Sequence, residues 1–143
     1  MGDWFETRGI CEFAPSLNAK GKTTRRDGKS TEWWMILRCD REIGAYLRKL
    51  YAMSTHGVSE LQEPLWGTHV SVIRDEEPPN LDRWRELEGA ELTVRYSQVV
   101  EIHSSYAVVQ AQCDEALDYR ESLGLSREPE LPLHMTIGNL KRS

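Results

Sequence analysis

The sequence predicts an α+β domain that combines several strands with two helices. Short apolar runs of strand length recur along the chain, and two segments carry apolar residues at helical spacing just after an aspartate. The order strand, helix, strand also occurs once in each half of the chain. The predicted strands cover 33–39, 66–73, 91–102, 106–112 and 132–138.

The chain has the length and composition of one soluble domain. It contains 143 residues, of which 39% are hydrophobic and 29% are charged, so we expect a single domain over residues 1–143. No apolar stretch approaches the roughly 20 residues that a membrane-spanning helix needs, and the first residues lack the features of a secretory signal. We therefore expect no association with a membrane.

The net charge limits which ligands we expect the protein to bind, and the cysteine content indicates its redox compartment. The formal net charge of -5 argues against binding duplex DNA through bulk electrostatics, but it permits a pocket for one or two phosphates. The cysteines Cys11, Cys39 and Cys113 are odd in number and widely spaced, which argues against a disulfide framework or a zinc knuckle. These observations favour a reducing compartment, and we expect a cytoplasmic protein.

The first half begins with a segment of little periodicity and continues as strand, helix and strand. Residues 14–31 predict a flexible loop, whose basic residues form either a solvated stretch or an arm toward an anionic ligand. The apolar run 33–39 has strand length, and Asp40 occupies the N-cap position of a helix that ends near 54–57. The β-branched segment 66–73 predicts the next strand.

The second half repeats this plan. Strands are predicted over 91–102 and 106–112, with a turn at 103–105 between them. Asp114 is expected to be the N-cap of a second helix, and Gly124 fits its C-terminal cap. A last apolar strand then completes the chain.

Placed side by side, the halves align Cys39 with Cys113 and His69 with His134. The cysteine-to-histidine spacing differs between the halves, and a difference in loop length explains this, because insertions collect in loops. The sequence therefore predicts an internal duplication of a strand-helix-strand unit.

Each half carries a histidine that is followed two residues later by a hydroxyl residue. Alternate residues of a strand share a face, so His69 points with Ser71, and His134 points with Thr136. A two-fold axis between the halves would bring both pairs to one cleft. There, one imidazole can accept a proton from an attacking hydroxyl while the other donates one to the leaving oxygen, and the hydroxyls hold the phosphate. This chemistry requires no metal and no other cofactor.

Several other residues are candidates for catalysis or for ligand binding. His103 also has a serine two residues later, but it falls in the predicted turn, and His56 precedes a glycine at the predicted helix end. Trp66 is the best candidate for stacking on a nucleobase, because it lies three residues before His69. Arg74 is either a phosphate contact or a surface charge.

The segments Gly67-Thr68-His69-Val70-Ser71-Val72-Ile73-Arg74 and Leu133-His134-Met135-Thr136-Ile137-Gly138-Asn139 resemble the paired motifs of the 2H phosphoesterase superfamily. This LigT-like superfamily takes its name from two His-x-Ser/Thr motifs flanked by apolar residues. The resemblance covers most of residues 33–140 and is strongest to a small phage-encoded, RNA-repair-like branch. It implies a bilobal α+β fold, in which two antiparallel sheets related by a pseudo-two-fold axis face a central cleft and carry outer helices.

The resemblance also implies a function. His69 and His134 would be the catalytic acid/base pair, while Ser71 and Thr136 would bind the substrate phosphate. The expected activity is metal-independent cleavage of a ribonucleotide phosphodiester, such as a cyclic oligonucleotide of antiviral defence or a 2′,3′-cyclic phosphate at an RNA end.

Two alternatives belong to other classes of protein. A non-catalytic module would sequester a nucleotide in the same cleft, and a metallohydrolase would use the histidines as ligands, although the sequence lacks typical ligand spacing. The expected partner is a small nucleotide, a cyclic oligonucleotide or an RNA end. We expect a monomer, located in the host cytoplasm for a phage-encoded member.

Overall fold

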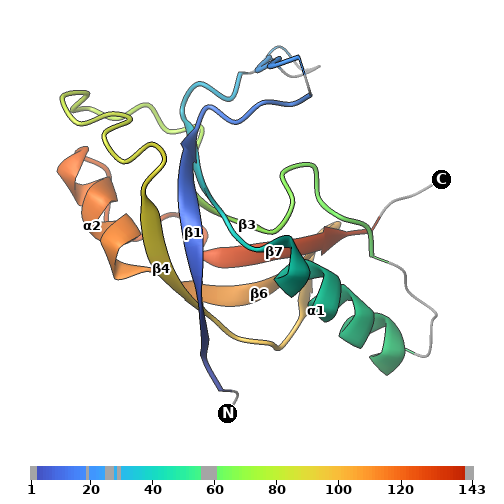
Figure 1. Cartoon of the computed structure of the whole chain (residues 1–143). Coiled ribbons are helices and arrows are strands. Elements are labelled where there is room, and N and C mark those ends of the chain that lie inside the picture. Colours follow the sequence, from blue (N-terminus) through green and yellow to red (C-terminus); the bar gives the residue numbers. More distant parts are fainter. Residues whose placement is uncertain (1–2, 19, 25–27, 29, 56–60, 141–143) are drawn as a thin grey trace.

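The computed structural model describes residues 3–18, 20–24, 28, 30–55 and 61–140 (Figure 1). Within these residues the elements are β1 (Phe5–Phe13), β2 (Trp34–Arg38), α1 (Arg41–Ser54), β3 (His69–Arg74), β4 (Glu91–Tyr96), β5 (Glu101–His103), β6 (Tyr106–Gln112), α2 (Asp114–Ser122) and β7 (His134–Asn139). The predicted α+β class is confirmed.

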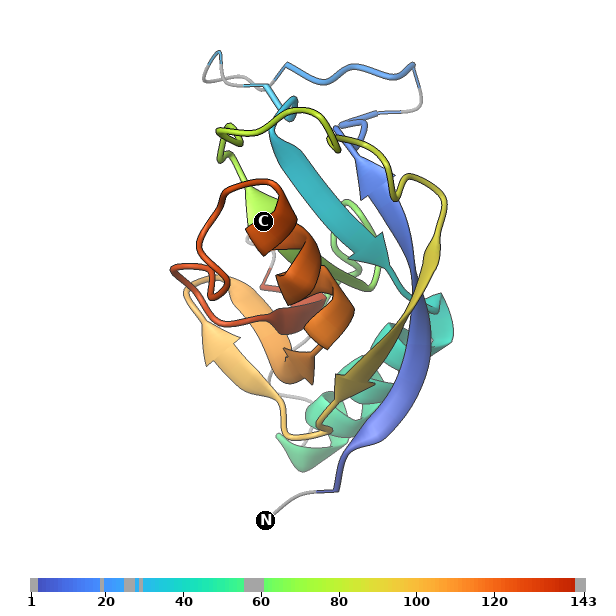
Figure 2. The same cartoon turned by 90° about the vertical axis from the view of Figure 1, so that its left-hand side faces the viewer.

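The strands pair in antiparallel fashion and close on themselves. Their order is β4-β1-β2-β3-β7-β6-β5, and β4 pairs with β6 as well, so six strands form a closed barrel to which β5 is added at β6. Figures 1 and 2 show β6 and β7 crossing the direction of β1 and β4, with α1 and α2 on different sides of the molecule. Two three-stranded units, β1-β2-β3 and β5-β6-β7, meet at the β3–β7 pair.

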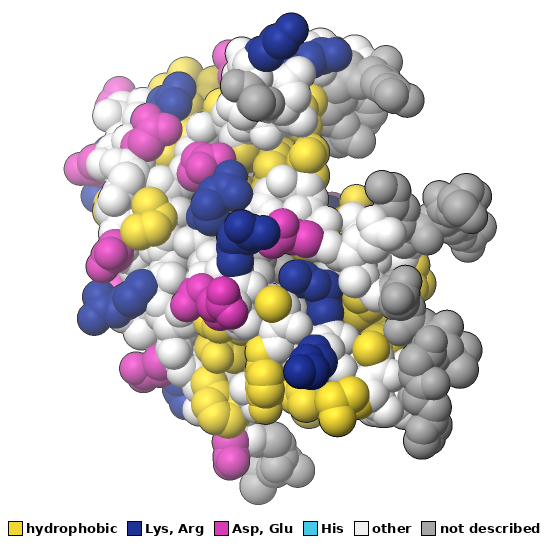
Figure 3. Space-filling view, turned by 45° about the vertical axis from the view of Figure 1, so that its right-hand side comes forward, with side chains coloured by type: hydrophobic (Ala, Val, Ile, Leu, Met, Phe, Trp, Pro, Cys, Tyr) yellow, Lys and Arg dark blue, Asp and Glu magenta, His cyan; other side chains and the backbone are white. Residues whose placement is uncertain are grey.

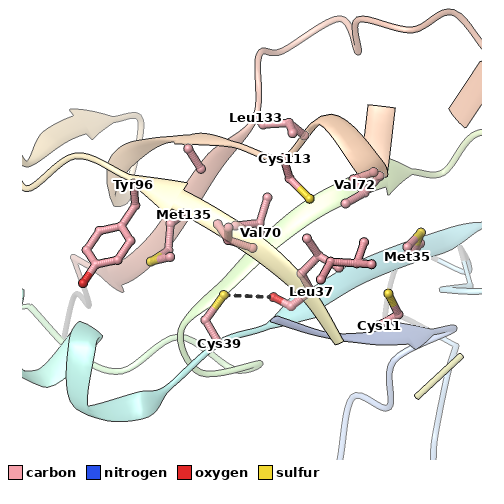
Figure 4. Close-up of a cluster of buried hydrophobic side chains, with 14 of the residues drawn as sticks. Cys11, Met35, Leu37, Cys39, Val70, Val72, Tyr96, Cys113, Leu133 and Met135 are labelled. Atoms are coloured by element: carbon pink, nitrogen blue, oxygen red, sulfur yellow. Dashed lines mark hydrogen bonds between the residues drawn. The ribbon is translucent and has the colours of Figure 1, made fainter. Parts of the chain in front are cut away.

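Apolar side chains of alternate strand residues fill the interior. Val70 and Val72 of β3 are fully buried, as are Met135 and Ile137 of β7, which places the core on the strand face opposite the two His-x-Ser/Thr pairs. The three cysteines are buried and free. Figure 4 shows them among the core residues, with the Cys39 thiol donating to the backbone carbonyl of residue 37.

Two of the three predicted helix caps, Asp40 and Gly124, are confirmed, and the third, Asp114, is not. Asp40 is the N-cap of α1, and its carboxylate accepts a hydrogen bond from a backbone N–H two residues later, as predicted. The N-cap prediction for Asp114 is wrong. Cys113 keeps an extended backbone and occupies that position, so Asp114 lies in the first turn, where its charge favours the helix N-terminus. Gly124 follows the C-cap with a φ of 83°, which is the left-handed conformation that a C-terminal glycine supplies.

Two strand predictions are too long. The predicted strand 91–102 is divided into β4 and β5. After Tyr96 the backbone N–H of Ser97 donates to the carbonyl of Gln110, and the chain pairs with β6 again only from Glu101, in a shifted register. The predicted strand 66–73 begins only at His69. A turn at Pro64 to Gly67, where Gly67 has a φ of 67°, delays its start.

The two three-stranded units have the same register. In the first unit Trp34, Ile36 and Arg38 lie opposite Arg74, Ser71 and His69. In the second unit Tyr106, Val108 and Gln110 lie opposite Asn139, Thr136 and His134. Each pairing has a register shift at the matching place, between Met35 and Ile36 in one unit and between Ala107 and Val108 in the other.

This register corrects the alignment of the cysteines. Because Arg38 corresponds to Gln110, Cys39 corresponds to Ala111 rather than to Cys113. The two further residues that lengthen β6, Ala111 and Gln112, pair with β4. They close the barrel and displace the second cysteine by two positions.

An arginine of each helix is hydrogen-bonded to the histidine-bearing strand of the other unit. Arg48 of α1 donates to the carbonyl of Ile137 at 2.7 Å, and Arg120 of α2 donates to the carbonyl of Val72 at 2.9 Å. The acceptor is in both cases the residue that follows the hydroxyl of the motif. Each unit therefore contributes an arginine hydrogen bond to the histidine-bearing strand of the other.

The surface in Figure 3 mixes both signs of charge. Lysine and arginine side chains lie among aspartate and glutamate side chains over the middle of this face, and hydrophobic side chains gather along its lower part. Among the described residues, no helix has the length and apolar character needed to cross a membrane.

Candidate active site

The face of β3 and β7 that points away from the core lines a cavity of about 940 Å³. His69, Ser71, His134 and Thr136 all line this cavity. The structure thus brings together the four residues that the sequence predicts to act together, and their chemical roles stay predictions.

Strand register fixes how the four side chains are arranged. His69 lies opposite Thr136, and the same antiparallel register brings Ser71 level with His134. The histidines are therefore diagonal neighbours on one face, and diagonal Cβ atoms of paired strands are typically about 7–8 Å apart. Each imidazole has a hydroxyl directly across the strand pair. A tetrahedral phosphate placed between the two diagonal imidazoles would have His69 on one side and His134 on the opposite side. The hydroxyls of Ser71 and Thr136 would lie at its two other sides.

Both imidazoles are held by the same kind of hydrogen bond. Nδ1 of His69 lies 2.8 Å from the carbonyl oxygen of Gly67, and Nδ1 of His134 lies 2.9 Å from the carbonyl oxygen of Pro132. A carbonyl only accepts, so Nδ1 of each ring carries the proton in these bonds. Nε2 is left as the atom that can gain or lose a proton, and it makes no hydrogen bond to any part of the chain that the structure describes.

The two rings differ in their electrostatic surroundings. Burial, joined by the positive charges of Arg38 and Arg74, lowers the pKa of His69 from 6.5 to about 4. Burial also lowers the pKa of His134, with smaller contributions from Arg74 and His103. The side chain of His69 is only 7% exposed, so in the free protein at neutral pH it is a neutral imidazole that can accept a proton.

Aromatic rings form one wall of the cavity beside His69. Trp66, the predicted stacking residue, lies with its ring centroid 5.5 Å from that of His69 and 5.4 Å from that of Trp34. Its indole N–H donates to the carbonyl of Ser16 at 3.0 Å, which ties the 14–31 loop to this wall. The guanidinium of Arg74 lies 5.8 Å from the centre of the Trp34 ring. Trp66 and Arg74 both line the cavity.

The structure adds a residue that sequence analysis sets aside. His103 is the last residue of β5 rather than part of the predicted turn, and its ring lines the cavity, 6.3 Å from the ring of His134. Its Nε2 lies 3.3 Å from a carboxylate oxygen of Glu101. The His-x-Ser pattern at 103–105 is the signal that could have included it. The described residues do not include His56 or three basic residues of the 14–31 loop, Arg25, Arg26 and Lys29.

The described side chains form no group of three or more histidine, cysteine, aspartate or glutamate residues that could hold a metal ion. The polar groups that line the cavity are imidazoles, hydroxyls, amides, the guanidinium of Arg74 and the carboxylate of Glu101. The imidazoles can transfer protons, and the hydroxyls, amides and guanidinium can donate hydrogen bonds to an anion.

The comparisons with known proteins assign no family to the chain. No family model matches it, and neither a curated protein nor a solved structure matches it. Its function therefore has to be inferred from the geometry of the cavity.

Proposed function

We propose that this protein is a metal-independent phosphodiesterase of the 2H type, which cleaves a ribonucleotide phosphodiester. Two three-stranded units that share one register and meet at β3 and β7 support the bilobal, pseudo-two-fold arrangement that this proposal requires. The proposed substrates are a cyclic oligonucleotide or an RNA end that carries a 2′,3′-cyclic phosphate.

One observation carries the proposal. Two imidazoles on adjacent strands are bound through Nδ1 to the carbonyl two residues earlier, and each has a hydroxyl across the strand pair at one cavity. A core histidine needs hydrogen bonds for both ring nitrogens, whereas these rings each keep one nitrogen for a ligand. This repeated geometry is what paired proton transfer on a single phosphorus atom demands.

The reaction follows from these positions. Nε2 of one neutral imidazole accepts the proton of the attacking hydroxyl, which belongs to water or to the adjacent ribose 2′-OH, and its oxygen bonds to phosphorus. The bond from phosphorus to the leaving oxygen breaks on the opposite side, and the other imidazole, protonated at Nε2, donates its proton to that oxygen. Ser71 and Thr136 donate hydrogen bonds to the non-bridging oxygens as charge develops on them.

The aromatic wall supplies a place for a base. Trp66 lies against His69, so a nucleobase that stacks on it would belong to the nucleotide next to the scissile phosphate. Stacking of this kind contributes about 1–3 kcal/mol per base in single-stranded ligands. We propose Trp66 as the base-stacking residue and Arg74 as a contact to substrate phosphate.

The test is a cleavage assay with defined substrates. Cyclic dinucleotides, cyclic trinucleotides and an RNA with a 2′,3′-cyclic phosphate end are incubated with the protein, with and without chelator. His69→Ala and His134→Ala should each reduce cleavage by about 10²–10⁴-fold, because each removes a proton-transfer group. His103→Ala is the matched control, because it removes a third imidazole of the same cavity and should cost less.

The outcomes separate the three classes of protein. Cleavage that persists in chelator and is lost in both alanine variants supports the proposal. Cleavage that chelator abolishes would assign a metallohydrolase. Tight retention of a cyclic nucleotide without any turnover would instead assign a binding module that sequesters it.

A further inference from the structure

The residue beside each histidine differs between the two units. Arg38 lies opposite His69 on β2, and Gln110 lies opposite His134 on β6. A glutamate from the next strand binds each of them. Glu12 accepts from the Arg38 guanidinium at 2.9 and 3.2 Å, and Glu101 accepts from the Gln110 amide at 3.2 Å. The scaffold is thus the same in both units, while the charge beside the imidazole is not.

Arg38 is also connected to the hydrogen bond that fixes His69. Its Nη1 donates to the backbone carbonyl of Trp66 at 2.6 Å. The next carbonyl along the chain, that of Gly67, accepts the Nδ1 proton of His69. Gly67 has a φ of 67°, so the chain reverses there and presents successive carbonyls to Arg38 and to His69. Among the described residues, Gln110 makes no such bond to the segment before His134.

Building on the proposed function, we propose that Arg38 is a positioning residue that commits His69 to the role of proton acceptor, while the uncharged Gln110 leaves His134 as the proton donor. Two effects act together in Arg38. It holds the Trp66–Gly67 segment, which keeps the proton on Nδ1 and directs Nε2 into the cavity. Its positive charge opposes a second positive charge on His69.

The charges around each ring support this division. His69 faces Arg38 from β2, Arg74 from its own strand and His134 from β7, and each of them disfavours its protonated form. The carboxylate of Glu12 on β1 is the negative group on this side, and it is paired with Arg38. His134 faces Arg74 and His103 but has no guanidinium on its neighbouring strand β6. Burial is the largest cause of the lowered pKa at both rings. The charge of Arg38 lowers the pKa of His69 further, and His134 has no equivalent arginine on β6.

The experiment follows the titration of each imidazole by NMR in the free protein, alongside the pH profile of kcat/KM. In Arg38→Gln the His69 titration should move to higher pH by about one unit, because a nearby like charge is removed. The acidic limb of kcat/KM should move with it. In Gln110→Arg the His134 titration should move to lower pH.

Two matched variants separate charge from packing. Arg38→Lys keeps the charge but loses the two-armed contact to Glu12, so His69 should still titrate at low pH while kcat falls. Glu12→Gln removes the opposing carboxylate, so the His69 titration should stay low or fall further. A purely structural role for Arg38 would move the His69 titration in the same direction in Arg38→Gln and Glu12→Gln, and this would overturn the inference.

The NMR titrations of the histidines do not depend on catalytic turnover, so the proposed role of Arg38 and the proposed function can each fail separately. A wild-type protein that cleaves no substrate would refute the proposed function, and with it the assignment of donor and acceptor. A protein that cleaves, with His69 titration and acidic limb unchanged in Arg38→Gln, would refute the role of Arg38 and leave the proposed function intact.

Discussion

The β1-β2-α1-β3 and β5-β6-α2-β7 units share their backbone but not their charges. Both have the same strand register, the same place of register shift, an arginine bonded across to the other unit, and a histidine bound through Nδ1 two residues back. The side chains around the histidines then differ. Arg38 and Arg74 of the first unit correspond to Gln110 and Asn139 of the second.

A repeated scaffold can therefore place one residue type in two different electrostatic surroundings. Backbone pairing places the imidazoles symmetrically, and a few substitutions on neighbouring strands make their electrostatic surroundings unequal. Acid/base catalysis at a phosphate needs one neutral and one protonated imidazole at the same time, and unequal surroundings decide which ring carries the proton. Substitutions at matching positions of the two units test which shared features are equivalent and which are not.

The largest difference is expected between the two arginines that join the units. Arg120 is fully buried and also forms a two-armed ion pair with Glu76 at 2.8 and 3.0 Å, whereas Arg48 is half-buried. Arg120→Met should lower the free energy of unfolding by about 3–5 kcal/mol, because it leaves a carboxylate and buried carbonyls without their donor. Arg48→Met should cost about 1.5 kcal/mol. Urea unfolding of both variants measures this, and equal losses would contradict the prediction.

The next effect tests whether the two hydroxyls are equivalent. Ser71→Ala and Thr136→Ala should each lower kcat by about 10²–10³-fold, because each removes a donor to the developing negative charge. The two losses should be similar, since the register places both hydroxyls opposite an imidazole. Ser71→Thr, which makes the two motifs alike, is the control and should retain activity. A loss confined to one unit would show that the phosphate is bound asymmetrically.

The smallest effect concerns pH and stability. The pKa of His69 is about 4 in the folded protein and 6.5 when unperturbed, so between these values the unfolded chain binds a proton that the folded protein does not. Stability from this group is complete above pH 6.5 and is lost as the pH falls to 4, by about 3 kcal/mol in total. His69→Gln should remove most of this loss, and His134→Gln should remove less. Denaturant unfolding at pH 7 and pH 4 measures the difference, and a His69→Gln curve parallel to wild type would refute it.

Local signals predicted much of the fold. The strand 106–112 agrees with β6, and Asp40 caps α1, because both depend on neighbouring residues alone. The pairing of the His-x-Ser/Thr motifs at one cavity was also accessible, because strand alternation decides which face a side chain takes. Closure of the barrel was not, since it depends on the β1–β4 pair, whose partners lie far apart in the chain.

The parts of the site that the sequence missed come from neighbouring strands. Arg38 and Gln110 reach the histidines through pairing between strands, and no spacing within the sequence shows which residue will lie opposite His69 or His134. His103 was set aside because the sequence placed it in a turn, whereas it is the last residue of β5 and pairs with Tyr106 at the edge of the cavity. The cysteine alignment failed for a related reason, because the extra residues of β6 serve the contact with β4.

Closure of the sheet into a barrel also affects how readily the folded protein can aggregate with other chains. Every described strand except β5 pairs with two neighbouring strands, although the β3–β7 and β4–β6 ladders each extend over only two residues, and β5 is three residues long. An open edge exposes unsatisfied amide and carbonyl groups on which a foreign strand can assemble, and short edges limit that hazard. Closure of the barrel therefore leaves no long described strand wholly unpaired along one edge, which reduces the edge on which a foreign strand can assemble.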